Sequence, residues 1–253
     1  MRGVPVVRRL FTLTTLVVLA GGAAASSLHA QTPPLPTIDQ VLDKYIAAAG
    51  GRAAIEKITS AAAKGTIQIP DVGISGTIEL YQKAPDKALT VAEFSGMGGQ
   101  RQGFDGTVGW TQDDQNGLRQ LDGAELADVR RSAILGRELK MKTIYPTMTV
   151  KAREKVGTRD AFLVEAVPAD GAAARLDFDA ESGLLLRQVA TRQTSQGPLE
   201  VEVTFDDYRE VDGVKRAFTI RQATAMFTAM IQLTEVKQNV PIDDAIFKIP
   251  KGD

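Results

Sequence analysis

Apolar residues near the start of the chain follow a helical period after a run of prolines. Thr37 is followed three residues later by Gln40, which is a capping-box pattern typical of a helix start. Apolar positions then recur at helical spacing until Gly50-Gly51, a pair that favours a helix stop. The pattern predicts a first helix over 38–49 and a second, short helix over 52–58.

The period changes from helical to two near residue 60, and short extended runs follow at spacings of about 8–12 residues. Asp105-Gly106, between two of these runs, is a strong hairpin signal. A helical pattern over 121–135 interrupts the series, with acidic residues early and arginines late, as the helix dipole favours. Strands then resume and continue to about residue 236. Because no crossover helices separate them, they predict an antiparallel meander of about ten or eleven strands.

The first thirty residues have the pattern of an export signal. Arg2, Arg8 and Arg9 precede an apolar run from 10 to 19, and a small-residue stretch follows it. Cleavage after Ala30 is expected, with Ala25 as an earlier alternative. The apolar run is short for a membrane anchor, which needs about 20 residues. We therefore expect a signal peptide over 1–30, a Pro-rich tether over 31–36, a single domain over 37–253, and a periplasmic protein that does not span the membrane after signal removal.

Composition narrows the chemistry that this chain can perform. It has no Cys, and its one His, His29, lies within the expected signal. Without either residue the mature chain lacks Ser-His-Asp and Cys-His catalysis and the common zinc ligands. Removing the three signal arginines from 30 basic residues leaves 27, against 31 acidic residues. With a net charge of about −4 and no basic cluster, the mature chain lacks the basic surface that nucleic-acid binding requires.

Three segments resemble a known family. Residues 103–110 (GFDGTVGW) resemble an Asp-Gly-x-x-x-Trp hairpin, and 178–185 (FDAESGLL) resemble an aromatic-Asp-x-x-x-Gly-Leu-Leu turn. Residues 239–247 (NVPIDDAIF) resemble a closing segment in which an Asp-containing loop precedes Phe. With one helix before the strands and another inserted among them, the chain resembles the outer-membrane lipoprotein-sorting superfamily, the LolA/LolB-like carriers. It resembles the poorly characterised relatives of the carriers more than the carrier itself.

The resemblance implies a mainly β fold of the α+β class. A curved antiparallel sheet would form an incomplete barrel, and the N-terminal and inserted helices would cover its concave face. The space between sheet and helices would be an apolar cavity for acyl chains. Candidate lining residues are Leu42, Ile46, Ile78, Leu80, Phe94, Phe104, Trp110, Leu126, Val129, Ile134, Phe162, Phe205, Met226, Phe227 and Met230. Each of them could equally fill a packed core, and Trp110 could be structural.

Charged residues offer weaker candidates. The acids near 177–181 and 206–212 flank turns and lack the spacing of a calcium loop, so turn chemistry explains them. Arg130, Arg131 and Arg137, on or after the inserted helix, could meet an anionic lipid or a partner, although such charges usually form a solvated helix face.

The sequence favours a non-catalytic periplasmic carrier or binder of a lipid, a lipoprotein acyl chain or another hydrophobic molecule. We expect no catalytic residue, no metal and no cofactor. One alternative is an interaction or stress-sensor module that binds an envelope protein with the same half-barrel. Another is an enzyme that works through carboxylates, for which Asp179 and Asp207 are the residues to test.

Overall fold

Thirteen antiparallel strands form one continuous sheet in the computed structural model, which describes residues 34–194 and 197–251. Their order across the sheet is β6-β5-β4-β3-β2-β1-β13-β12-β11-β10-β9-β8-β7. The strands are β1 (Ser60–Ile69), β2 (Ile74–Lys83), β3 (Lys87–Phe94), β4 (Gly98–Phe104), β5 (Gly109–Asp113), β6 (Gly117–Gln120), β7 (Thr147–Val156), β8 (Arg159–Val167), β9 (Ala174–Asp179), β10 (Leu185–Thr194), β11 (Gly197–Val211), β12 (Val214–Ala223) and β13 (Thr228–Gln238).

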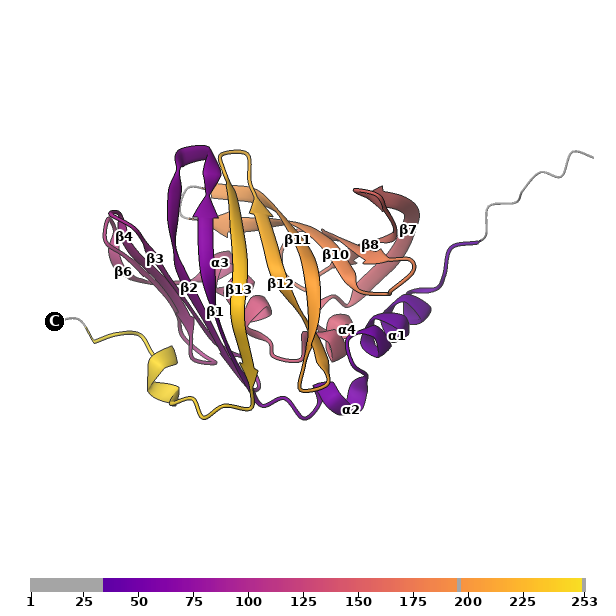
Figure 1. Cartoon of the computed structure of the whole chain (residues 1–253), viewed down its shortest axis with the longest axis horizontal. Coiled ribbons are helices and arrows are strands. Elements are labelled where there is room, and N and C mark those ends of the chain that lie inside the picture. The colour runs from indigo at the N-terminus through magenta and orange to yellow at the C-terminus, as the bar shows by residue number, and fades with distance from the viewer. Residues whose placement is uncertain (1–33, 195–196, 252–253) are drawn as a thin grey trace, which may run out of the picture. The chain divides into compact units, whose positions relative to one another are not determined.

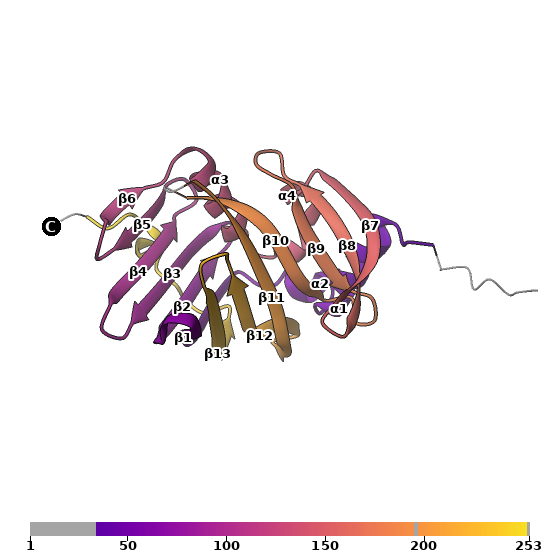
Figure 2. The same ribbon diagram turned by 90° about the horizontal axis from the view of Figure 1, so that it is seen from above.

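The first and last strands of the chain pair in the middle of the sheet, where β1 lies against β13 (Figure 1). Two meanders therefore extend in opposite directions from one central pair, and β6 and β7 form the two outer edges. The sheet is strongly curved and is not closed into a barrel (Figure 2). The predicted fold class, a curved antiparallel sheet forming an incomplete barrel, is confirmed.

Helical segments lie on the concave face of this sheet. They are α1 (Ile38–Ala48), α3 (Gly123–Ala133), the 3-10 turn η2 (Arg137–Leu139) and α4 (Met141–Ile144). The short helix α2 (Arg52–Ile55) lies at the end of the sheet, beside the turn between β11 and β12 (Figure 1). Helix α3 contacts β4 and β5 in one meander and β10 in the other, so it bridges the two wings of the sheet. Two further 3-10 turns are η1 (Pro70–Val72) and η3 (Asp244–Phe247).

The apolar core is divided among clusters on the two faces of the sheet. The largest lies under α1 and α4, where the rings of Tyr45 and Phe178 meet edge to face with centroids 5.1 Å apart. A second joins α3 to the sheet through Phe104, which is fully buried. A third packs Phe247 of η3 against Trp110. Because η3 lies outside the curve of the sheet (Figure 1), Trp110 belongs to the convex face.

Several local predictions are confirmed. Helix α1 begins with the expected capping box: the Thr37 hydroxyl accepts from the Gln40 amide at 3.2 Å, and the Gln40 side chain accepts from the Thr37 amide at 2.8 Å. The Asp105-Gly106 turn joins β4 to β5, with Gly106 at a φ of +100° that favours glycine.

Other local predictions need correction. The sheet has thirteen strands, not about ten or eleven, and β6 was missed because it is short and polar. The helix expected over 121–135 ends at Ala133, and Gly136, with φ +64°, redirects the chain into η2 and α4. The second helix ends at Ile55.

The predicted signal peptide and residues 31–33 of the tether lie outside the described residues. From Leu35 onward the chain forms one compact unit. Within the described part of the chain, no helix is both long enough and apolar enough to cross a membrane.

Candidate functional site

A cavity of about 390 Å³ lies between the concave face of the sheet and the helical segments. This volume falls in the range of about 300–1,000 Å³ typical of small-molecule sites. Residues from both wings of the sheet, and from α1, α3, η2 and α4, line it. Its apolar side chains include Tyr45, Ala61, Ala63, Leu80, Ala88, Val129, Met141, Leu185, Phe205, Ile220, Leu233 and Val236.

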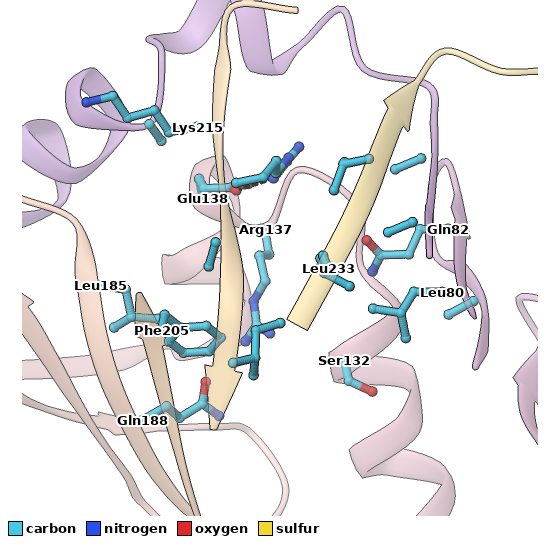
Figure 3. Close-up of a pocket in the computed structure, with 18 of the residues that line it drawn as sticks. Leu80, Gln82, Ser132, Arg137, Glu138, Leu185, Gln188, Phe205, Lys215 and Leu233 are labelled. Carbon is cyan, nitrogen blue, oxygen red and sulfur yellow. Dashed lines mark hydrogen bonds and ion pairs between the residues drawn. The ribbon is translucent and has the colours of Figure 1, made fainter. Parts of the chain in front are cut away.

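Small residues on the central strands create this space. Ala63 of β1 pairs with Leu80 of β2, and Ala61 lies two residues earlier on the same face. Ala88 of β3 lines the same region. Because an alanine side chain is a single methyl group, the helices above these strands leave a gap that larger residues would fill. Figure 3 shows Leu80 and Leu233 on one side of the gap and Leu185 and Phe205 on the other.

An ion pair is embedded in the cavity wall. Arg216 of β12 donates from Nη1 to Glu138 Oε1 of η2 at 2.8 Å. Glu138 Oε2 and Arg216 Nη2 are also buried, and neither has a hydrogen-bond partner among the described residues. The wall therefore presents one unpaired acceptor and one unpaired donor beside apolar surface. A bound polar group or a water would satisfy both.

Two tyrosines lie near this pair. Burial and the nearby Glu138 carboxylate raise the pKa of Tyr45 well above its ordinary value, so its phenol stays protonated. Burial likewise raises the pKa of Tyr208, whose hydroxyl donates to the Leu185 carbonyl at 2.7 Å. These phenols are neutral hydrogen-bonding groups at physiological pH and are poor candidates for a nucleophile or base.

Arg137 extends from η2 into the space between the two wings, toward Phe205 and Gln188 (Figure 3). Its guanidinium makes no hydrogen bond or ion pair with any residue in 34–194 or 197–251. Lys215, by contrast, is exposed and points away from the other labelled side chains. Arg137 is thus the one labelled cation in this view that reaches the interior without a partner among the described residues.

Three of the predicted lining residues border the cavity: Leu80, Val129 and Phe205. Most others lie in packed clusters or against them, namely Leu42, Ile46, Ile78, Phe94, Phe104, Trp110, Leu126, Ile134, Phe162 and Phe227. Met230 is half-buried, and Met226 is 74% exposed at the turn between β12 and β13. Their contact with a ligand stays a prediction.

Trp110 illustrates why an aromatic in a hairpin need not face a ligand. Trp110 pairs with Gly103, and Phe104 pairs with Gly109, so the two aromatic side chains point to opposite faces of the sheet. The Trp110 indole donates to the Phe247 carbonyl at 2.8 Å and fixes the closing segment of the chain. A β-carbon on Gly103 would lie 2.3 Å from the Trp110 ring, so this hairpin requires glycine there.

The other family-like segments are structural as well. Asp179 Oδ1 accepts from the amides of Glu181 and Ser182 at 2.9 and 2.6 Å, and its Oδ2 accepts from Arg159 at 2.6 Å. Asn239, in a left-handed conformation, accepts from the Thr59 amide at 2.8 Å and ties the end of β13 to the start of β1. The side chains of Asp179 and Asn239 therefore stabilise the backbone turns of these two motifs.

Three of the acids considered for metal binding, Asp177, Asp179 and Asp207, pair with arginines. Asp177 is fully buried and accepts from Arg187 Nε at 2.7 Å, and Asp207 pairs with Arg209 at 2.6 Å. Burial raises the pKa of Asp177, and the Arg187 guanidinium opposes that shift. In the described ranges no group of three or more His, Cys, Asp or Glu residues could hold a metal ion.

Solved structures share this fold. A DUF1329 family protein from Desulfovibrio piger aligns with a TM-score of 0.56 and 13% identity, over 83% of this chain and 97% of that one. A LolA superfamily protein from Nitrosomonas europaea aligns at 0.55 and 14%, over 85% and 98%. A putative outer membrane lipoprotein-sorting protein domain from Vibrio parahaemolyticus aligns at 0.54 and 13%, over 77% and 92%.

The chain therefore has the fold of the LolA superfamily, as its motifs predicted. At these identities the likeness establishes the architecture alone. No protein-family model and no curated protein matches the sequence.

Sequence reasoning missed most of the polar residues of the site. Glu138 and Arg216 come from segments 78 residues apart and meet only because η2 lies over β12. Arg137 was noted as one of three arginines near the inserted helix, where a solvated face was the usual interpretation. The signal that could have found it is Gly136, whose left-handed backbone ends the helical direction and turns Arg137 inward.

Proposed function

We propose that this protein binds and carries a hydrophobic ligand, a lipid or an acyl chain, in the bacterial periplasm, and that it does so without catalysing a reaction. The observation that supports this function is the 390 Å³ cavity, apolar on most of its wall, between a curved sheet and bridging helices. The likeness to solved lipoprotein-sorting folds supports the same interpretation.

The driving force would be removal of apolar surface from water. Each methylene buried contributes about 0.8 kcal/mol, so a chain of about ten methylenes gains about 8 kcal/mol before the cost of association. The alanine-lined floor and the leucines, valines and phenylalanine around it offer such a chain contact on several sides. No covalent step is needed for this role.

Release would depend on the segments that close the cavity. Helix α3 contacts both wings of the sheet and contributes Val129 and Ser132 to the lining. A shift of α3 would open the space, and a partner that binds the open form better would favour release. Capture and delivery then become a change in the population of open and closed forms.

The expected export signal supports the proposed location. Three arginines precede a short apolar run, and this order is typical of a cleaved signal. We infer that the mature protein begins at Gln31 and consists of one domain over 37–253, with residues 31–36 as a tether. The intact mass of the protein purified from an envelope fraction tests this inference.

Native mass spectrometry of the same preparation, followed by organic extraction, tests the function. A co-purifying lipid near one per chain, lost in an Ala63→Phe variant, is the expected result. Ala63→Phe fills the cavity from its floor, whereas Ala62→Phe, on the opposite face of β1, is the matched control. A protein that purifies from the envelope fraction without a bound lipid, and that does not bind apolar probes, would contradict the proposal. That result would favour a protein-binding module.

A further inference from the structure

A second, smaller pocket adjoins the apolar cavity. It measures about 50 Å³ and lies between α3, η2, α4, β10 and the segment before β9. Ser132, Arg137 and Gln188 line both spaces, so they form the boundary between them. An apolar chamber and a small polar one therefore lie side by side, and these three polar side chains contact both.

The smaller pocket is rich in positive charge. Arg131, Arg137 and Arg192 line it, against a single carboxylate, Asp128. Asp128 is already engaged: one oxygen pairs with Arg131, and the other accepts from the Gln193 amide at 2.9 Å. Arg131 is held further by the Asp170 carbonyl at 2.6 Å. Both oxygens of the Asp128 carboxylate are therefore already bound, one by Arg131 and one by the Gln193 amide.

Arg137 and Arg192 lack such partners. Within residues 34–194 and 197–251, neither guanidinium makes a hydrogen bond or an ion pair, and both side chains are half-buried. Burial lowers the pKa of Arg192, the Asp128 carboxylate opposes that shift, and the charges of Arg137 and Arg131 add to it. Two like charges in a poorly solvated pocket repel each other, and a bound anion would relieve that repulsion.

From this juxtaposition we propose that the ligand is an anionic amphiphile, whose carboxylate or phosphate binds between Arg137 and Arg192 while its chain occupies the apolar cavity. This inference rests on the proposed function and specifies its ligand class. Guanidinium groups present paired N–H donors that match carboxylate and phosphate oxygens. Ser132 and Gln188, at the boundary, add neutral hydrogen-bonding groups where the head would meet the chain.

Three amphiphiles with the same chain separate the contribution of the head from that of the chain. Tridecanoate, dodecyl phosphate and dodecanol, which share a twelve-carbon alkyl chain, compete against an uncharged fluorescent apolar probe, at a pH of about 8 where both anions are ionised. Dissociation constants are obtained for the wild type and for Arg137→Gln, Arg192→Gln and Arg130→Gln. Arg130 is exposed on α3, the helix that borders both spaces, and is the control arginine because it lines neither of them.

We expect both anions to bind the wild type about tenfold more tightly than dodecanol, equivalent to about 1.4 kcal/mol. Arg137→Gln and Arg192→Gln should each remove most of that advantage, measured as the ratio of the dodecanol and anion dissociation constants within the same variant, while Arg130→Gln retains it. Cooperative urea unfolding of each variant shows that it is folded. The stronger of the two anions indicates whether a free fatty acid or a lipid phosphate is the better match.

Equal binding of dodecanol and the anions to the wild type would overturn the inference while leaving the proposed function intact. So would an anion advantage that survives in both Arg137→Gln and Arg192→Gln. If neither the probe nor dodecanol binds, the proposed function itself fails, and the anionic-ligand inference fails with it. The two failures are therefore distinguishable in one experiment.

Discussion

Glu138 and Arg216 form an ion pair of 2.8 Å inside the cavity wall, and each leaves one buried atom unpaired among the described residues. Glu138→Leu alone should destabilise the protein by about 2–3 kcal/mol, because Arg216 keeps its charge without a partner. This loss is smaller than the loss of about 3–5 kcal/mol on removing one partner of a fully buried ion pair, because 21% of the Arg216 side chain is exposed to solvent. Urea denaturation measures the loss.

The double variant Glu138→Leu/Arg216→Met provides the control for that prediction. Replacing both members of the pair by apolar residues removes the stranded charge, so its stability should lie within about 1 kcal/mol of the wild type. A double variant as unstable as Glu138→Leu would show that the pair contributes net stability, and would contradict this interpretation.

The closing segment should give the protein an acid-sensitive contact. Hydrogen bonds from Lys83 and Lys87 hold the pKa of Asp244 at about 2. A carboxyl group whose pKa is lower in the folded state stabilises the fold above its unfolded pKa of about 3.9, and that stability is lost as pH falls toward the folded value. Asp244→Asn should therefore lower the urea midpoint at neutral pH, and the difference from wild type should disappear near pH 2.

A constant difference between Asp244→Asn and the wild type across that pH range would contradict the assignment. Asp243→Asn is the neighbouring control for general loop effects, although it caps η3 by accepting from the Ala245 amide at 2.9 Å. Asparagine retains that acceptor, so the control should change little.

The contact between Gly103 and Trp110 predicts a second stability effect. A methyl group at position 103 would lie 2.3 Å from the indole, so Gly103→Ala should cost about 1–3 kcal/mol through overpacking. In a Trp110→Leu background the same change should cost less than about 1 kcal/mol, because the ring is gone. Thermal denaturation followed by far-ultraviolet circular dichroism measures all four chains, and equal costs in both backgrounds would refute the packing argument.

The sequence predicted most of the fold because its local signals agree with the structure. The Thr37 capping box, the Asp105-Gly106 turn and the long run of period-two strands each specify an element without reference to distant residues. Strand β6 was not predicted because four residues, most of them polar, are too few to show a strand periodicity that would distinguish them from a loop.

The site was harder to predict, for a physical reason. An apolar strand residue looks the same in sequence whether it faces a packed helix or empty space. Ile78 and Leu80 lie two residues apart on the same face of β2 and belong to or pack against the same cluster, yet of the two Leu80 alone borders the cavity. What distinguishes them is the position of the helices, which depends on contacts across the whole sheet. The same holds for Arg137, whose direction depends on the backbone of Gly136.

A comparison of two neighbouring alanines of β1 tests whether the cavity is the binding site. An apolar fluorescent probe should bind the wild type with a stoichiometry near one, and Ala63→Phe should weaken its binding at least about tenfold by filling the cavity. Ala62→Phe, on the opposite face, should bind as the wild type does, and both variants should unfold cooperatively. If Ala63→Phe binds the probe as tightly as Ala62→Phe, the cavity is not the binding site, and the proposed function is wrong.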